Sequence, residues 1–197
     1  MVSESKRRIE MAAAGLLARH GYHGFGLKKL SEAAGLPYGS IYHHFPGGKE
    51  EIAVSAVTST GVVLGQMLRE APEDVFDRTA TLFEVMVTKL TASQWTDGCP
   101  VGTPALDGGS DVAAVRTACV SAFDAMASGF AELLTEMGMP EPQSRELATT
   151  VVAAYEGATL LARVRRSDEP LLTVAAAMAR LIRQSLAEMP VVDRSPT

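Results

Sequence analysis

Apolar side chains recur three and four residues apart along almost the whole chain, the spacing that places them on one face of an α-helix. The first such run predicts a helix that ends near Gly21, and it consists of Ile9, Ala12, Ala13, Leu16 and Leu17. The strand pattern, in which β-branched residues alternate with polar ones, occurs nowhere at length. The sequence therefore predicts an all-α protein.

Two short helices joined by a tight turn are expected next. The apolar positions of residues 27–34 fit two turns of helix. Gly35 can adopt the left-handed conformation that ends a helix, and Pro37 is tolerated at a helix start, where its missing N–H costs little. Ile41 and Phe45 lie one turn apart on the second short helix and are expected to face inward. This layout is typical of a helix-turn-helix.

The remainder of the chain is predicted to form long helices separated by glycine and proline. The sequence Pro46-Gly47-Gly48 breaks the chain before Lys49, which opens the fourth helix. Two prolines and four glycines predict a loop over residues 97–110. Long helices are predicted over residues 49–67, 72–93, 111–137, 143–166 and 171–189, with a frayed tail at residues 191–197.

Charge is distributed unevenly, although the formal net charge of −5 alone argues against a nucleic-acid-binding protein. Residues 1–52 hold seven Lys or Arg against five Asp or Glu, a net charge of +2, and all four histidines lie there. The remaining residues hold eleven Lys or Arg against eighteen Asp or Glu, a net charge of −7. A basic end on an acidic body is expected where one end of a molecule meets phosphates.

Cysteine usage and hydropathy indicate a cytoplasmic protein. The two cysteines, Cys99 and Cys119, favour reduced thiols over a disulfide framework. The N-terminus is charged, and Gly15 and Arg19 interrupt the alanines that follow, so no signal peptide is expected. No apolar run approaches the roughly 20 residues needed to cross a bilayer, so no membrane partner is expected.

The second of the two short helices carries side chains suited to reading DNA. On a helical wheel, Gly39, Tyr42 and His43 lie away from the face formed by Ile41 and Phe45. The tyrosine and the histidine can donate to phosphates or base edges, and the glycine allows the backbone to approach the duplex. Further contacts are expected from Ser40 and from the flanking lysines Lys28, Lys29 and Lys49, the last at the positive end of the fourth helix.

These residues carry a resemblance to a known family. The string AAGLLARHGYHGFGLKKLSEAAGLPYGSIYHHFPGGKEEI, residues 13–52, resembles the DNA-binding domain of the TetR family of bacterial repressors. Its specific core reads AAG-x-x-x-G-x-x-Y-x-H-F and is followed by a lysine. The resemblance covers about the first 60 residues. It implies an all-α homodimer whose two recognition helices enter successive major grooves of a palindromic DNA operator.

The resemblance also implies roles for single positions. Residues expected to approach base edges are Pro37, Tyr38, Gly39 and Ser40, and those expected to touch phosphate or sugar are Tyr42 and His44, with Lys49 holding the backbone. The helix-turn-helix is expected at about residues 27–46, within a DNA-binding domain over residues 3–63. A domain for ligand binding and dimerisation is expected over residues 64–190.

Two departures from the family pattern favour an alternative. Phe25-Gly26 stands where such proteins often place Thr or Ser as cap and phosphate contact, and Pro37 stands where they often place Ser. Both changes remove hydroxyl donors at the DNA flank. The alternative function is therefore a dimeric small-molecule-binding protein with weakened DNA binding.

The later part of the chain resembles a subgroup of the same family. The motifs Gly98-Cys99-Pro100-Val101-Gly102 and Ala105-Leu106 are similar to those of lincomycin- and flavonoid-responsive repressors, which implies release from DNA by a small molecule. A pocket for such a molecule needs apolar and aromatic walls with a few polar groups. The candidate lining residues are Phe83, Met86, Val87, Leu90, Trp95, Cys99, Phe123, Met126, Phe130 and Tyr155. Residues of these types at helical spacing also fit an ordinary core.

The last two helices are expected to form the homodimer interface, because their small residues allow close helix approach. The expected contact residues are Val151, Val152, Ala154, Tyr155, Ala158, Leu161 and Ala162 on one helix and Val174, Ala175, Met178, Leu181, Ile182 and Leu186 on the other. Burial within one subunit is the alternative use of the same faces.

Catalysis and metal binding are not expected, and a redox-sensing role of Cys99 is kept as an alternative. No nucleophile elbow, phosphate loop or zinc-ligand spacing occurs, and no cofactor is predicted. The adjacent His43 and His44 point about 100° apart on a helix, and no nearby Cys or Asp completes a zinc set. Cys99 has no basic neighbour in the sequence that would lower the pKa of its thiol. The sequence thus predicts a ligand-responsive DNA-binding regulator, and the family resemblance implies a repressor.

Overall fold

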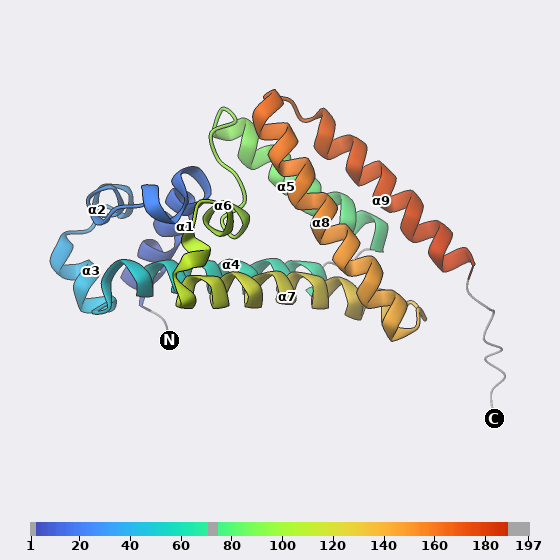
Figure 1. The fold of residues 1–197 in the computed structure, drawn as a ribbon, viewed down its shortest axis with the longest axis horizontal. Helices are drawn as coiled ribbons and strands as arrows, with labels where there is room; N and C mark the ends of the chain where they lie inside the picture. The colour runs from blue at the N-terminus through green and yellow to red at the C-terminus, as the bar shows by residue number, and fades with distance from the viewer. Residues whose placement is uncertain (1–2, 71–74, 189–197) are drawn as a thin grey trace.

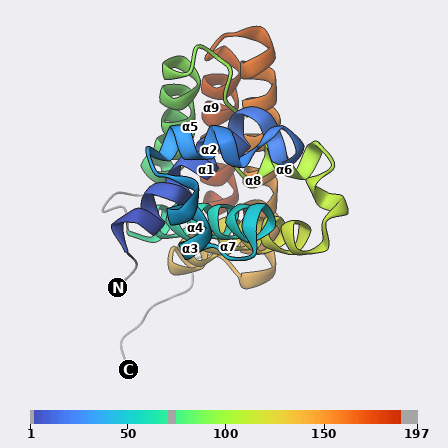
Figure 2. The ribbon, with the colours of Figure 1, turned by 90° about the vertical axis from the view of Figure 1, so that its left-hand side faces the viewer.

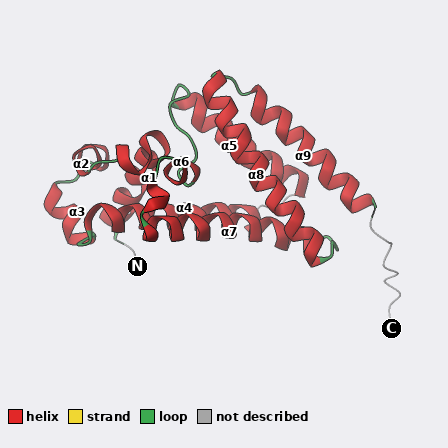
Figure 3. Cartoon of the chain, in the orientation of Figure 1, coloured by secondary structure: helices red, strands yellow, loops and turns green. Residues whose placement is uncertain are grey.

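The computed structural model describes residues 3–70 and 75–188, and these residues form helices joined by turns and loops, with no strand among them (Figure 3). The long helices are α1 (Glu4–Gly24), α4 (Gly48–Glu70), α5 (Val75–Ala92), α7 (Ala113–Glu136), α8 (Glu141–Arg165) and α9 (Glu169–Ala187). The short ones are α2 (Leu27–Ala34), α3 (Tyr38–His44), α6 (Gly102–Leu106) and the 3₁₀ turn η1 (Gly109–Asp111). The predicted all-α class is confirmed.

The molecule has a small head and a larger body (Figure 1). Helices α1, α2 and α3 form the head, and α4 runs out of the head along α7. Helices α5, α8 and α9 lie together on one side of this pair, with α8 also packed on α7. Figure 2 views the molecule from the head end, where α2 and α3 face the reader. The head thus presents one side to solvent and rests the other on the body.

Close packing of α4 on α7 depends on Gly61. A Cβ at this position would lie 2.6 Å from the Ala122 Cα, which is closer than real Cβ atoms approach. Both residues are buried at the contact. The two backbones can therefore approach only because the α4 residue has no side chain.

The described chain departs from the sequence prediction at two places. Gly21 does interrupt the first helix, with φ at +64°, but helical residues continue to Gly24 beyond the kink. The segment predicted as a loop over residues 97–110 contains α6 and most of η1. These short elements are formed by packing against α1 and α7, which hydrophobic periodicity does not report.

The other helix boundaries differ from the predicted ones by up to three residues. The predicted helix start at residue 72, the predicted end at residue 189 and the tail at residues 191–197 lie outside the described residues. Among the described helices, none is long and apolar enough to cross a membrane.

Candidate functional site

The turn between α2 and α3 is fixed by backbone hydrogen bonds. Gly35 adopts the left-handed conformation at φ 62° and ψ 36°, and its N–H donates to the Glu32 carbonyl at 3.2 Å. The Leu36 N–H donates to the Ser31 carbonyl at 3.1 Å, and the Ser31 hydroxyl donates to the Leu36 carbonyl at 2.7 Å. This pattern satisfies the last carbonyls of α2 and directs the chain into α3.

Arg8 connects the turn to α1. Its guanidinium donates to the Ala34 carbonyl at 2.6 Å, at the C-terminal end of α2. A charged donor on a carbonyl is among the stronger hydrogen bonds, and a cation is favourable at a helix C-terminus. Arg8 was not among the predicted site residues, because its partner lies 26 residues away and is a backbone group.

Helix α3 has one buried face and one exposed face. Ile41 and Phe45 are buried in the head core, which confirms the predicted orientation. Tyr38 and Tyr42 are exposed by 45% and 48%, and His43 is also exposed. The remaining predicted contacts divide into the exposed Pro37 and Gly39 and the half-buried Ser40 and His44. The exposed face presents two phenol rings and an imidazole on a rigidly packed helix.

The predicted lysine contacts occupy different environments. Lys28 and Lys29 are exposed on α2. Lys49, in the first turn of α4, is half-buried, and its Nζ lies 4.6 Å from the centroid of the Tyr22 ring. This cation–π contact holds the ammonium at the junction of α1 and α4.

The start of α2 has no hydroxyl cap. Gly26 occupies the N-cap position with no side-chain hydrogen bond, while Phe25 is buried in the head core. Only the Gly26 carbonyl contributes, accepting from the Leu30 N–H at 3.0 Å. The departure from the family pattern that the sequence indicates is therefore present in the folded chain.

Most of the predicted ligand-binding residues lie in the core of the body. The buried ones are Phe83, Met86, Leu90, Cys99, Met126, Phe130 and Tyr155, and the half-buried ones are Val87, Trp95 and Phe123. The Phe83 and Tyr155 rings pack edge to face with centroids 5.4 Å apart. Two of the ten, Met86 and Tyr155, line a cavity.

This cavity lies where the head meets the body and has a volume of about 510 Å³. It is lined by residues of α1, α4, α5 and α8 together with Pro100. The lining side chains are Arg7, Glu10, Met11, Ala14, Ala56, Ser59, Thr60, Val63, Leu64, Met67, Val85, Met86, Lys89, Pro100 and Tyr155. Four of them belong to α1, a helix from which no ligand contact was predicted.

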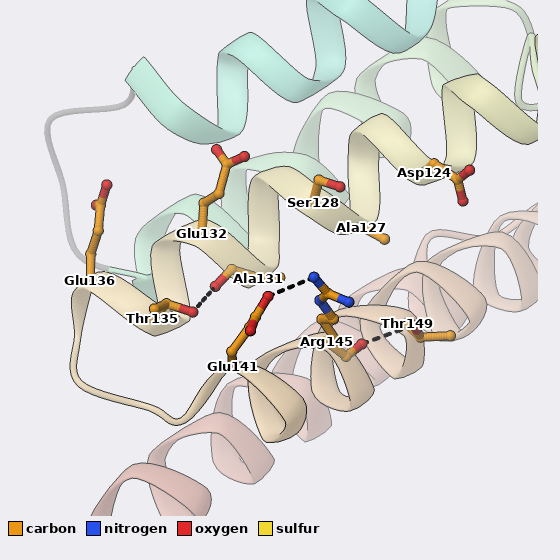
Figure 4. Close-up of a pocket in the computed structure, with 10 residues that line it drawn as sticks. All are labelled: Asp124, Ala127, Ser128, Ala131, Glu132, Thr135, Glu136, Glu141, Arg145 and Thr149. Atoms are coloured by element: carbon orange, nitrogen blue, oxygen red, sulfur yellow. Dashed lines mark hydrogen bonds and ion pairs between the residues drawn. The ribbon is translucent and has the colours of Figure 1, made fainter.

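A larger hollow of about 870 Å³ lies between α7 and α8 (Figure 4). Its walls carry four acidic residues, Asp124, Glu132, Glu136 and Glu141, and Arg145 forms an ion pair with Glu141 at 2.6 Å. The hollow has no residue of the head in its lining. Its polar and acidic walls do not suit the apolar ligand that the sequence predicts.

The segment between α5 and α7 fastens the head to the body. The Arg19 guanidinium pairs with the Asp97 carboxylate at 2.7 Å, and the Gly98 N–H donates to the Ala18 carbonyl at 2.9 Å. The Asp107 carboxylate accepts from the His23 N–H at 2.8 Å. These three contacts span α1 from its last helical turns to its end, so movement of this segment would move the head.

Cys99 is buried beside a carboxyl group. Its thiol lies beside Glu156, whose Oε1 is buried without a hydrogen-bond partner. Burial, reinforced by the Glu156 carboxylate, raises the pKa of the Cys99 thiol well above its ordinary value, and burial also raises the pKa of Glu156. A buried, protonated thiol is a poor nucleophile, so the surroundings oppose a redox role.

The expected dimer helices bury part of their apolar surface within the subunit. Of the expected contact residues, Val151, Val152, Tyr155, Ala158, Ala162 and Ile182 are buried in the single chain. The large apolar side chains that remain exposed on α8 and α9 are Leu160, Leu161, Val164, Leu172 and Leu181. Three of these, Leu160, Val164 and Leu172, were not among the expected contacts.

Two family models match separate parts of the chain. Residues 10–56 match the bacterial regulatory proteins of the tetR family, and residues 75–177 match the C-terminal domain of LmrA/YxaF-like transcriptional regulators. The first match contains the whole helix-turn-helix, and the second contains the segment that fastens head to body. Both resemblances indicated by the sequence motifs are confirmed.

Relatives of similar length match along nearly the whole chain. The HTH-type transcriptional regulator YxaF of Bacillus subtilis is 32% identical over 186 residues, which cover 92% of this chain and 96% of the relative. The HTH-type transcriptional regulator LmrA of the same organism is 30% identical, covering 92% of this chain and 98% of the relative. The matching families and relatives are transcriptional regulators and not enzymes.

Solved structures show the same fold. A TetR transcriptional regulator from Legionella pneumophila superposes with a TM-score of 0.77 at 23% identity, covering 91% of this chain and 98% of that one. A cysteine mutant of the TetR family regulator CifR, in complex with a 26 bp operator duplex, has a TM-score of 0.64 at 23% identity and covers 93% and 96%. The chain therefore belongs to the TetR family of bacterial transcriptional regulators, is a DNA-binding protein of the helix-turn-helix type, and carries an LmrA/YxaF-like C-terminal domain.

Proposed function

We propose that this regulator is a homodimeric repressor that binds a palindromic operator through α3 and is released by a small apolar or aromatic molecule. The observation that carries the DNA-reading part is the exposed face of α3. Tyr38, Tyr42 and His43 project from a helix whose other face is anchored by Ile41 and Phe45. The CifR complex supports the same use of the fold, since that protein is bound to operator DNA.

Dimerisation would set the distance between two reading heads. Recognition helices of a two-fold dimer bind half-sites about 34–36 Å apart, one turn of DNA. Leu161 and Val164 on α8 and Leu172 and Leu181 on α9 give the proposed interface an apolar surface. A second copy of the chain would cover it through a four-helix contact, as the sequence predicts.

The fastening segment supports a ligand response. Because Asp97, Gly98 and Asp107 hold α1 by direct hydrogen bonds, a ligand that favours another arrangement of the body would shift the head. At saturating ligand, operator affinity would then fall by at most the factor by which the ligand prefers this other arrangement over the DNA-binding one. A ligand that bound both arrangements equally would release nothing.

Fluorescence anisotropy on a labelled duplex from the DNA beside the protein's own gene tests the DNA-binding part. We expect saturable binding that survives competitor DNA and weakens with salt, because phosphate contacts release counterions. A promoter reporter then tests repression, with lower expression expected when the protein is present. Binding no stronger than to random DNA would contradict a specific regulator of that site.

A dimeric ligand-binding protein with weakened DNA reading is the second candidate. The observation that favours it is the N-cap of α2, where Gly26 supplies no hydroxyl. Replacing this residue by Ser restores a family-type donor and helix cap. If Gly26→Ser converted random binding into specific binding, the second candidate would be favoured. Specific binding of the operator by the unaltered chain would contradict this second candidate function.

A further inference from the structure

We infer that the cavity between head and body binds an aromatic anion of drug-like size, with the ring system inside and the anionic group at the mouth. This inference rests on the proposed ligand response, because it assigns the site and the chemical class of that ligand. The relevant surfaces are an apolar interior, one unpartnered hydroxyl and a cationic mouth.

The interior of the cavity is apolar and of ligand size. Its buried end is formed by Ala56 of α4, Met86 of α5 and Pro100. Its volume of about 510 Å³ falls within the roughly 300–1,000 Å³ of pockets that enclose drug-sized ligands. The half-buried Met67 lines it as well, and methionine thioethers adapt their shape and contact aromatic rings favourably.

Tyr155 supplies a polar group within this apolar interior. The side chain is 1% exposed and lines the cavity, and its hydroxyl forms no hydrogen bond with any residue that the structure describes. The hydroxyl is not one of the fully buried polar atoms that lack a partner, so it retains access to solvent. A ligand oxygen or nitrogen that reached this hydroxyl would form a hydrogen bond with it and orient the ring system.

The mouth of the cavity carries an excess of positive charge. Arg7 of α1 and Lys89 of α5 are exposed at the mouth, and neither forms an ion pair within the described residues. The one acid in the lining, Glu10, is engaged through Oε1 by the Ser55 hydroxyl at 2.6 Å. The formal charge of the lining is thus +1, which favours an anionic group at this mouth.

Apolar side chains surround the same mouth. Met11 and Val63 are exposed by 65% and 61%, and Val85 is also exposed. A ring system that enters between them would remove this surface from water. The mouth is therefore suited to an amphipathic molecule and not to a simple inorganic anion.

A ligand in this cavity would touch head and body together. Arg7, Met11 and Ala14 belong to α1, whereas Met86, Lys89 and Tyr155 belong to the body. Ligand binding would therefore favour one spacing of α1 relative to α5. This is the differential contact that the proposed release from DNA requires.

A matched pair of fluorescent probes tests the site. The anionic probe is 8-anilinonaphthalene-1-sulfonate, and the neutral one is N-phenyl-1-naphthylamine, which has the same rings without the sulfonate. We expect one saturable site per chain and, in the double variant Arg7→Gln/Lys89→Gln, a dissociation constant for the anionic probe that rises about five- to tenfold. Neutral probe binding should change by less than about twofold, because it makes no ionic contact.

Two further variants locate the site. Val63→Trp blocks the mouth from an exposed position and should weaken both probes by about tenfold or more, whereas Val120→Trp, on the exposed face of α7 outside the cavity, should not. Arg116→Gln/Arg166→Gln removes two exposed cations that lie outside the lining and should leave the anionic probe unaffected. The inference would be overturned if the cavity variants and the control variants lost probe affinity equally. It would also be overturned if Arg7→Gln/Lys89→Gln weakened the anionic and the neutral probe equally.

Operator affinity measured in the same samples separates this inference from the proposed function. Probe binding at the cavity that leaves operator binding unchanged would support the site and contradict release by its occupation. Intact operator binding with no cavity-dependent probe binding would overturn the site and leave the DNA-binding function standing.

Discussion

The Asp107 carboxylate accepts a hydrogen bond from the backbone N–H of His23 at 2.8 Å and thereby joins the segment after α5 to the end of α1. Its second oxygen accepts from the Gly109 N–H at 3.1 Å, which holds the carboxylate in place. The approach requires Gly21, because a Cβ there would collide with the carboxylate and φ is +64°. The kink at Gly21 therefore leaves room for a carboxylate that helps to fasten the head.

Removal of this carboxylate should weaken the attachment of the head. We expect Asp107→Ala to lower the free energy of unfolding by about 1–3 kcal/mol, because two backbone donors lose a charged acceptor. Chemical denaturation followed by circular dichroism measures the change. Asp111→Ala, an exposed acid in the same segment, is the control and should change stability by less than about 0.5 kcal/mol. Equal losses would contradict a specific role for Asp107.

The contact of α4 with α7 gives a prediction about glycine. Gly61→Ala should destabilise the protein by about 1–3 kcal/mol, because the added methyl group would meet the Ala122 backbone. Gly15→Ala in α1 has open space around its Cβ and should stabilise by about 0.5–1 kcal/mol through helix propensity. Thermal unfolding of both variants tests the pair. A stabilising effect of the α4 substitution would show that the helices separate easily.

Glu156 gives a prediction about pH. Burial raises the pKa of its carboxyl above the ordinary value, so the folded chain holds this proton more tightly than the unfolded chain. The contribution of this proton to the free energy of unfolding is fully present below the ordinary pKa of glutamate. It is lost as the pH rises through the raised pKa of the folded chain. Glu156→Gln, which stays neutral, should therefore unfold at a higher temperature than the natural chain at pH 8, and the difference should shrink towards pH 4. Glu146→Gln, at an exposed position on the same helix, is the control. A difference independent of pH would contradict the assigned cause.

The apolar face of α8 and α9 gives a prediction about assembly. Val164 is 74% exposed in the single chain, so an arginine there should leave the subunit fold intact. In the proposed homodimer, Val164→Arg would bury a charge in the interface and should weaken association by at least tenfold. Sedimentation velocity measures the shift from dimer to monomer, and Leu106→Arg on α6 is the matched control. An unshifted dimer would place the interface elsewhere.

The reading head was the part of the fold best predicted from the sequence. Gly35, Pro37, Ile41 and Phe45 act through local backbone geometry and helix periodicity, which a sequence carries directly. The contacts that hold the head together and fasten it to the body could not be predicted from the sequence. Arg8 and Asp107 bind backbone groups 26 and 84 residues away, and no local pattern reports such partners.

The candidate ligand site was predicted less well, for a physical reason. Phe83, Met126 and Phe130 show the same helical spacing whether they fill a core or line a cavity, and the fold places them in the core. Met86 and Tyr155 share that pattern and do line the cavity. Sequence periodicity identifies which side chains face inward, but not where packing leaves space.

Operator affinity of a variant altered only on the exposed face of α3 tests the central claim most directly. Tyr42→Ala/His43→Ala leaves Ile41 and Phe45 in place, so the head should remain folded with an unchanged unfolding temperature. By fluorescence anisotropy on the operator, we expect affinity to fall by at least about tenfold, with a smaller loss on random DNA that reflects the phosphate or sugar contact of Tyr42. Unchanged affinity for the operator in a folded variant would contradict the assignment of α3 as the reading helix.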